Sequence, residues 1–130
     1  MNSKKILEIS LLAGALYFLC IAIAHTFDYK IPGLFIYYNI PSFQYQDKII
    51  SFLAFGWAAF FYAGSRNIEI IKPLLLTVIV GIAGLVNINL STEFNKITDL
   101  TTPTPFWLQT FLITLYAIWL MLFTVKTWRQ

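Results

Sequence analysis

The chain has 130 residues with a formal net charge of +3 at pH 7, and it is 58% hydrophobic, 18% aromatic and 12% charged. A soluble domain has about 25% charged residues, and its core could not bury this much apolar surface. The composition therefore excludes an ordinary water-soluble protein, and a charge of +3 without a clustered basic face does not point to nucleic acid.

Four apolar segments make up most of the chain, at residues 6–27, 48–65, 72–92 and 105–126. The middle of each segment lacks Asp, Glu, Lys, Arg and His, and each segment approaches the ~20 residues that cross a bilayer as a helix. Short connections leave no room for a separate extramembrane domain. We therefore predict an all-α integral membrane protein with one domain, residues 1–130, arranged as an antiparallel four-transmembrane-helix bundle.

The only histidine of the chain, His25, lies at the end of the first apolar segment. Asp28 follows three residues later, and the two side chains share a helical face if the first helix continues that far. In one interpretation the carboxylate orients the imidazole, which then acts as a general base or a metal ligand. In the simpler interpretation, His25 is an interfacial residue that bonds to water, lipid headgroups or a nearby backbone group.

The segment after the first span, residues 31–45, combines Pro32 and Pro41 with aromatic residues such as Tyr37 and Tyr38. It is too polar and too interrupted by proline to span the membrane, and too aromatic for a solvated loop. Tyr rings prefer the headgroup level, where the hydroxyl stays hydrated. We predict an aromatic interfacial segment after the first helix, which either covers a lipid-like ligand or only anchors the protein at its depth.

The second and third spans are joined by a short connection that ends before Pro73, a residue suited to the first turn of a helix. The third span ends in polar residues, of which Asn87 lies deepest and therefore needs a partner inside the protein. If the helix continues to Glu93, Asn89 shares a face with it. These groups either bond between helices or form a polar pocket with three other residues, His25, Asp28 and Asp47.

Small residues in the first three spans predict close helix contacts. They are Ala13, Gly14, Ala22, Gly56, Ala58, Ala59, Ala63, Gly81, Ala83 and Gly84. The fourth span is bulky instead, which suits contact with lipid or with a partner subunit. Its large residues are Trp107, Phe111, Tyr116, Trp119, Phe123 and Trp128.

The positive residues predict the orientation of the chain, because cytoplasmic flanks of membrane spans are enriched in Lys and Arg. Six of the nine lie on the side of the two termini, and they are Lys4, Lys5, Arg66, Lys72, Lys126 and Arg129. We therefore predict that both termini are cytoplasmic, in a cell inner membrane or plasma membrane.

Known catalytic and cofactor motifs are absent from the sequence. One histidine excludes haem ligation by two histidines of this chain, and there is no metal-ligand spacing, CxxC motif, nucleophile elbow or phosphate loop. We therefore predict no cofactor and no metal. Proton-coupled transport needs an ionisable group at depth, whereas Glu8, the acid of the first span, lies near its cytoplasmic edge.

These features favour a non-catalytic small membrane protein that binds a lipophilic ligand or serves as an accessory subunit of a membrane complex. The expected partners are membrane lipids, a lipophilic small molecule, and a membrane protein partner or second copies of the chain. The expected ligand-binding residues are His25, Tyr37, Tyr38, Asn87, Glu93 and Trp107. The alternative is a membrane enzyme acting on a lipid or quinone-like substrate through an outer-rim site of His25, Asp28 and Glu93.

Overall fold

The structure is a computed structural model that describes residues 2–35, 38, 40–97 and 104–129. Within these residues the regular secondary structure is helical. The elements are α1 (Ser3–Thr26), α2 (Gln44–Arg66), the 3-10 helix η1 (Ile68–Ile70), α3 (Ile71–Leu90), α4 (Thr92–Ile97) and α5 (Thr104–Trp128).

Four helical segments are long and apolar enough to cross a membrane. They cover Ser3–Thr26, Gln44–Arg66, Ile68–Leu90 and Thr104–Trp128, with 24, 23, 23 and 25 residues. At about 1.5 Å per residue, each reaches about 35 Å, which exceeds the ~30 Å hydrocarbon layer. The chain is therefore a multi-pass membrane protein, and its second span begins at Gln44, four residues before the predicted start.

Polar side chains define where several helices begin. The Asn2 side chain accepts a hydrogen bond from the Lys4 amide at 3.3 Å before α1, and the Gln46 side chain accepts one from the Phe43 amide at 2.9 Å before α2. Such bonds satisfy amides that have no partner inside a helix. The α2–α3 turn uses Asn67 in the same way, because its side chain accepts from the Glu69 amide at 2.9 Å.

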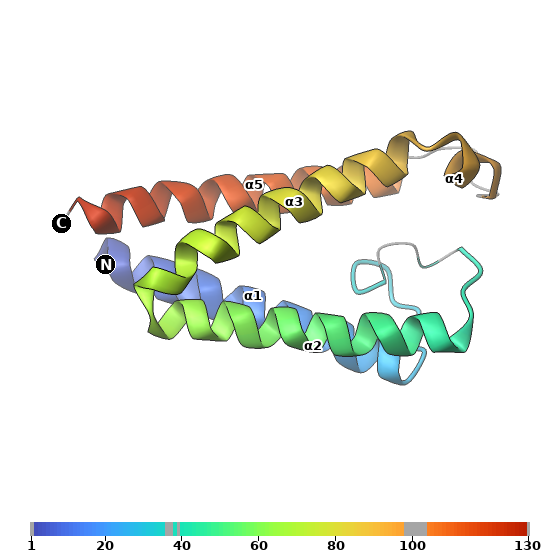
Figure 1. Cartoon of the computed structure of the whole chain (residues 1–130), viewed down its shortest axis with the longest axis horizontal. Coiled ribbons are helices and arrows are strands. Elements are labelled where there is room, and N and C mark those ends of the chain that lie inside the picture. Colours follow the sequence, from blue (N-terminus) through green and yellow to red (C-terminus); the bar gives the residue numbers. More distant parts are fainter. Residues whose placement is uncertain (1, 36–37, 39, 98–103, 130) are drawn as a thin grey trace.

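The four long helices form two pairs, with α1 beside α2 and α3 beside α5 (Figure 1). Both chain termini and the α2–α3 turn lie at one end of the molecule, and α1 also contacts α5. The pairs diverge toward the other end, where α4 and the segment between α1 and α2 are found (Figure 1). We call these the terminal end and the open end.

The main apolar core lies toward the terminal end and joins all four long helices. Its buried members are Leu7, Leu11, Phe61, Ile71, Leu74, Val78, Ala117 and Leu120. At this end the Lys72 ammonium also lies 4.6 Å from the centre of the Trp128 ring, which connects the start of α3 to the end of α5. A second, smaller cluster toward the open end, Ile21, Ala22 and Ala54, joins only α1 and α2.

The small residues differ in their packing. The prediction that the α3 glycines lie in close helix contacts is wrong for the described part of the chain. A Cβ built on Gly14 would lie 2.7 Å from Cδ1 of Phe61. In contrast, apart from the chain neighbours and the backbone of the same helix, no described atom lies within 4 Å of a Cβ built on Gly56, Gly81 or Gly84. The α3 glycines are not among the buried residues of this helix, which are Ile71, Leu74, Val78 and Asn89.

Two of the bulky residues of α5 face α1 as well as the surroundings. The Tyr116 hydroxyl donates to the backbone oxygen of Ser10 at 2.6 Å, and the Trp119 indole N–H donates to the Ser10 hydroxyl at 3.0 Å. These bonds fix α5 against α1, so part of the aromatic surface expected to contact lipid or a partner instead joins two helices of the same chain.

At the open end, helices α1 and α3 both end earlier than the sequence predicted. Helix α1 ends at Thr26, and Asp28 has a positive φ of 55° that reverses the chain. His25 and Asp28 therefore do not share a helical face, which corrects the prediction. Likewise α3 ends at Leu90 and a new helix begins at Thr92, so Asn89 and Glu93 belong to different helices.

Candidate functional site

The segment between α1 and α2 folds back into the open end, between the two helix pairs (Figure 1). Gly33 allows the tight reversal, because its φ of 92° is a conformation that other residues rarely adopt. The Gly33 carbonyl accepts hydrogen bonds from the Tyr17 hydroxyl of α1 and from the Gln109 amide of α5, the latter at 3.2 Å. The segment is therefore attached to both helix pairs.

A cavity of about 700 Å³, which we call the α1–α5 cavity, is bounded by α1, this segment and α5. Its apolar wall includes Leu34, Leu108, Leu112 and Ile113, and its polar groups belong to Tyr17, Tyr38, Gln109 and Tyr116. The Tyr17 and Tyr116 hydroxyls donate to backbone carbonyls of Gly33 and Ser10. The wall is thus mostly apolar, with a few polar groups.

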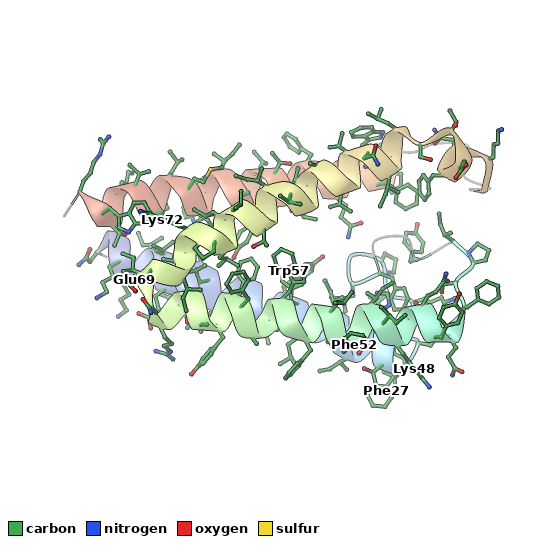
Figure 2. The ribbon with its side chains drawn as sticks, viewed as in Figure 1. Phe27, Lys48, Phe52, Trp57, Glu69 and Lys72 are labelled. Carbon is green, nitrogen blue, oxygen red and sulfur yellow. The ribbon has the colours of Figure 1, made fainter. Side chains whose placement is uncertain are left out.

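A second cavity of about 560 Å³, the α1–α2 cavity, lies between the end of α1, the first half of α2, and residues 34–35 and 40–42 of the connecting segment. Phe18, Trp57 and Leu53 contribute to its apolar wall. Trp57 lies on the side of α2 that faces α3, whereas Phe27 lies on the far side of the α1–α2 pair (Figure 2). Leu34 lines both cavities, so the segment forms a wall between them.

Two buried polar residues, His25 and Asp47, meet the exposed Ser42 in the α1–α2 cavity. Nδ1 of His25 lies 3.2 Å from Oδ1 of Asp47, and both side chains are buried, at 7% and 6% exposure. The Ser42 hydroxyl donates to Oδ2 of the same carboxylate at 2.8 Å. A carboxylate accepts hydrogen bonds, so the proton of the first bond lies on Nδ1. We call these three residues the His25 cluster.

Each member of the His25 cluster is positioned by its place in the fold. His25 lies in the last turn of α1 and Asp47 in the first turn of α2, where the helix dipole stabilises a negative charge. The Phe35 ring stacks on the imidazole with the ring centres 3.6 Å apart and the planes 20° apart. The imidazole is thereby held by a carboxylate at one edge and by an aromatic ring on one face.

Among the described contacts, neither Asp28 nor Glu93, the two acids predicted for the alternative catalytic site, is the hydrogen-bonding partner of His25. Asp28 is exposed and its carboxylate lies 3.9 Å from the Lys30 ammonium. Glu93 is exposed on α4. Asp47, 22 residues from His25 in sequence, is the acid that contacts the imidazole. The arrangement allows His25 to act as an oriented acceptor or base.

The predicted ligand-binding residues are divided among several places. His25 lines the α1–α2 cavity, and Tyr38 lines the α1–α5 cavity. Asn87, Glu93 and Trp107 line neither of these two cavities, and Tyr37 lies outside the described residues.

Asn89, rather than Asn87, is the buried amide of α3. Asn87 is exposed, whereas Asn89 is 5% exposed and its side chain donates to the Thr110 hydroxyl at 3.0 Å. Two positions along a helix correspond to about 200° of rotation, so burying one side chain exposes the other. Within the described residues the expected interhelical hydrogen bond is therefore made by Asn89 of α3 to Thr110 of α5, and not by Asn87.

Several site residues were not predicted, namely Tyr17, Phe35, Ser42 and Gln109. Asp47 was named only as a member of a polar pocket, although the sequence contained a stronger signal for it. His25 ends the first span and Asp47 begins the second, so two consecutive helices bring them to the same end of the molecule. For Tyr17 and Gln109 no such signal exists, because their common acceptor is a backbone carbonyl.

The described residues contain no group of three His, Cys, Asp or Glu side chains placed to hold a metal ion. Comparison with known proteins does not add a function: no family model matches the chain, and neither the curated proteins nor the solved structures contain a significant match.

Proposed function

We propose that this protein binds a lipophilic small molecule at its open end. The α1–α5 cavity is the observation that carries this proposal. Its volume of about 700 Å³ falls within the ~300–1,000 Å³ of typical small-molecule sites, which also have apolar walls and few polar groups. The aromatic segment after α1 covers the site, and Tyr38 and Gln109 supply polar contacts at its wall.

The proposed topology is an antiparallel four-helix bundle in the inner membrane or plasma membrane of the cell. Both chain termini lie in the cytoplasm. Six of nine Lys and Arg residues flank the spans on the side of the termini, which favours cytoplasmic retention of that side. The termini and the α2–α3 turn lie together in Figure 1, which agrees with this arrangement. The open end then faces the opposite side, and the ligand enters it from the membrane.

The test is native mass spectrometry of the protein extracted gently from its own membrane, with one variant that fills the cavity and one that does not. Leu112 lines the α1–α5 cavity and Leu122 does not, although both are 55% exposed on α5. We expect the wild type and Leu122→Trp to carry a stoichiometric lipophile, and Leu112→Trp to lose it.

A bare wild-type chain would contradict the ligand proposal. If that chain is held in a larger complex that survives mild solubilisation, the protein is instead an accessory subunit. A bare chain of doubled mass would point to a homo-oligomer.

A second candidate function is a membrane enzyme for a lipid or quinone-like substrate, and the buried contact between His25 and Asp47 favours it. In this function His25 is the general base and Asp47 orients it, while Asp28 and Glu93 have no part. Purified protein would be incubated with a membrane lipid extract and the products analysed by mass spectrometry. The enzyme predicts products that disappear with His25→Gln, and equal product profiles with and without protein would exclude it for that extract.

A further inference from the structure

The His25 cluster leaves one hydrogen-bonding atom of the imidazole without a role. Nδ1 is paired with Asp47, and in the neutral imidazole with its proton on Nδ1 the Nε2 atom carries a lone pair and accepts hydrogen bonds. No fully enclosed side-chain nitrogen or oxygen among the described residues lacks a partner. Since His25 lines the α1–α2 cavity and its described hydrogen bond uses Nδ1, Nε2 is accessible from that cavity.

The surroundings of His25 favour a particular kind of ligand head. Phe18, Phe35 and Trp57 line the cavity together with aliphatic side chains, and Phe18 and Trp57 stack with ring centres 5.3 Å apart. Aromatic walls accept flat rings in stacked or edge-on contact. The ligand head that fits this wall is therefore an aromatic ring rather than an acyl chain alone.

Charge narrows the class of ligand further. The described residues that line the cavity include Asp47 but no Lys or Arg. A phosphate or carboxylate headgroup would enter an apolar space beside a carboxylate without a compensating cation, which is unfavourable. A neutral hydroxyl group can donate to Nε2 and brings no charge.

We propose that the α1–α2 cavity is a second binding site, which takes a lipophilic phenol or hydroquinone whose hydroxyl donates to Nε2 of His25. Asp47 is a positioning residue in this site because it fixes the tautomer and the direction of the ring. Ser42 holds the second oxygen of Asp47. The inference rests on the proposed function only in that the ligand is lipophilic, since it concerns a different cavity.

The test compares two probes that differ only in the hydrogen-bond donor, para-nonylphenol and its methyl ether. Binding to the full chain in lipid nanodiscs is measured by titration calorimetry. The variants are His25→Phe, which keeps a ring against Phe35 but removes the acceptor, and Asn87→Leu, which removes an exposed polar group outside both cavities. Circular dichroism and thermal unfolding verify that each variant is folded.

We expect the wild type and Asn87→Leu to bind the phenol at least about tenfold more tightly than the ether, the scale of one buried hydrogen bond. His25→Phe should bind both probes with equal affinity. Equal affinities in the wild type, a preference retained in His25→Phe, or no binding of either probe to the wild type would each overturn the proposal.

A spectroscopic measurement keeps the proposal testable if His25→Phe does not fold. The chain contains one histidine, so nitrogen-labelled histidine gives signals that need no assignment to a residue. The Nε2 resonance of the wild type should shift on addition of the phenol and stay unchanged on addition of the ether. Identical responses to both probes would contradict the inference.

The two proposals fail separately. A preference for phenol over ether that is lost in Leu112→Trp but retained in His25→Phe would support the α1–α5 site and reject the His25 site. The wild-type chain could instead carry no co-purified lipophile and still bind the phenol more tightly than the ether. This result would reject the ligand proposal for the α1–α5 cavity and support the His25 site.

Discussion

At Gly14 the backbone of α1 lies close to side chains of both α2 and α5. A Cβ at this position would lie 2.5 Å from the Tyr116 hydroxyl oxygen and 2.7 Å from the Phe61 ring. Phe61 is 1% exposed and cannot move outward without opening the core. The absence of a side chain at position 14 is therefore a condition for the packing of three helices.

Gly14→Ala should destabilise the fold by about 1–3 kcal/mol, the usual cost of overpacking a core. Thermal unfolding in detergent, followed by circular dichroism, measures the change. Gly84→Ala is the matched control, because a Cβ there meets open space and alanine favours the helix. Equal midpoints for Gly14→Ala and the wild type would contradict the described packing.

The glycines also show what sequence can and cannot predict at the level of a residue. The sequence identified the small residues, because their identity is local information. It did not identify which of them lie in contacts, since Gly14 is packed and Gly81 is not. Contact depends on how neighbouring helices are inclined, and this is determined by interactions between distant parts of the chain.

Among the elements, α3 and α5 are joined at the open end by a buried polar contact. The Asn89 amide donates to the Thr110 hydroxyl at 3.0 Å, and that hydroxyl donates to the Phe106 carbonyl at 2.9 Å. An amide inside a membrane protein gains more from such a partner than from an apolar environment. The contact therefore helps to hold α3 and α5 together at the open end, away from the main apolar core.

Asn89→Ala should lower the unfolding free energy by about 0.5–2 kcal/mol, as expected for an interhelical hydrogen bond. Titration with a denaturing detergent measures the change. Asn87→Ala, at an exposed position of the same helix, should have little effect. If the two substitutions have equal effects, the assignment of Asn89 as the structural amide is wrong.

The four spanning helices were predictable, but the candidate site was predicted only in part. Long apolar segments predict helices from composition and length alone. The pairing of His25 with Asp47 depends on where α1 ends and on the fold of residues 27–43, which local pattern does not define. Because Asp28 has a positive φ, it is not helical and does not lie on the helical face of His25, where the sequence placed it as the predicted partner.

On the scale of the whole molecule, charge and shape divide the protein into two ends. Contacts at the terminal end include Arg66, which donates to Glu8 at 3.2 Å and links α2 to α1. Glu69 and Lys72 mark the same end in Figure 2. The open end carries the cavities and the His25 cluster, so the proposed binding functions and the positively charged flanks lie at opposite ends.

The proposed topology predicts that the two ends react differently with a membrane-impermeant maleimide. In a Cys20→Ala background, which removes the single cysteine, Glu93→Cys should be labelled on intact cells. Arg129→Cys should be labelled only after the membrane is permeabilised, and both positions are exposed in the structure. The reverse labelling pattern would place the open end in the cytoplasm.

Leu34 separates the two cavities and lines both of them. If both proposed sites bind ligands, a ligand that displaces this side chain from one cavity would narrow the other, and the occupancies of the two sites would be thermodynamically coupled. The coupling is reciprocal: if a molecule in the α1–α5 cavity weakens phenol binding beside His25 by some factor, the phenol weakens that molecule's binding by the same factor. If both proposed sites are correct, one leucine would give a chain of 130 residues the means of negative cooperativity between two lipophiles.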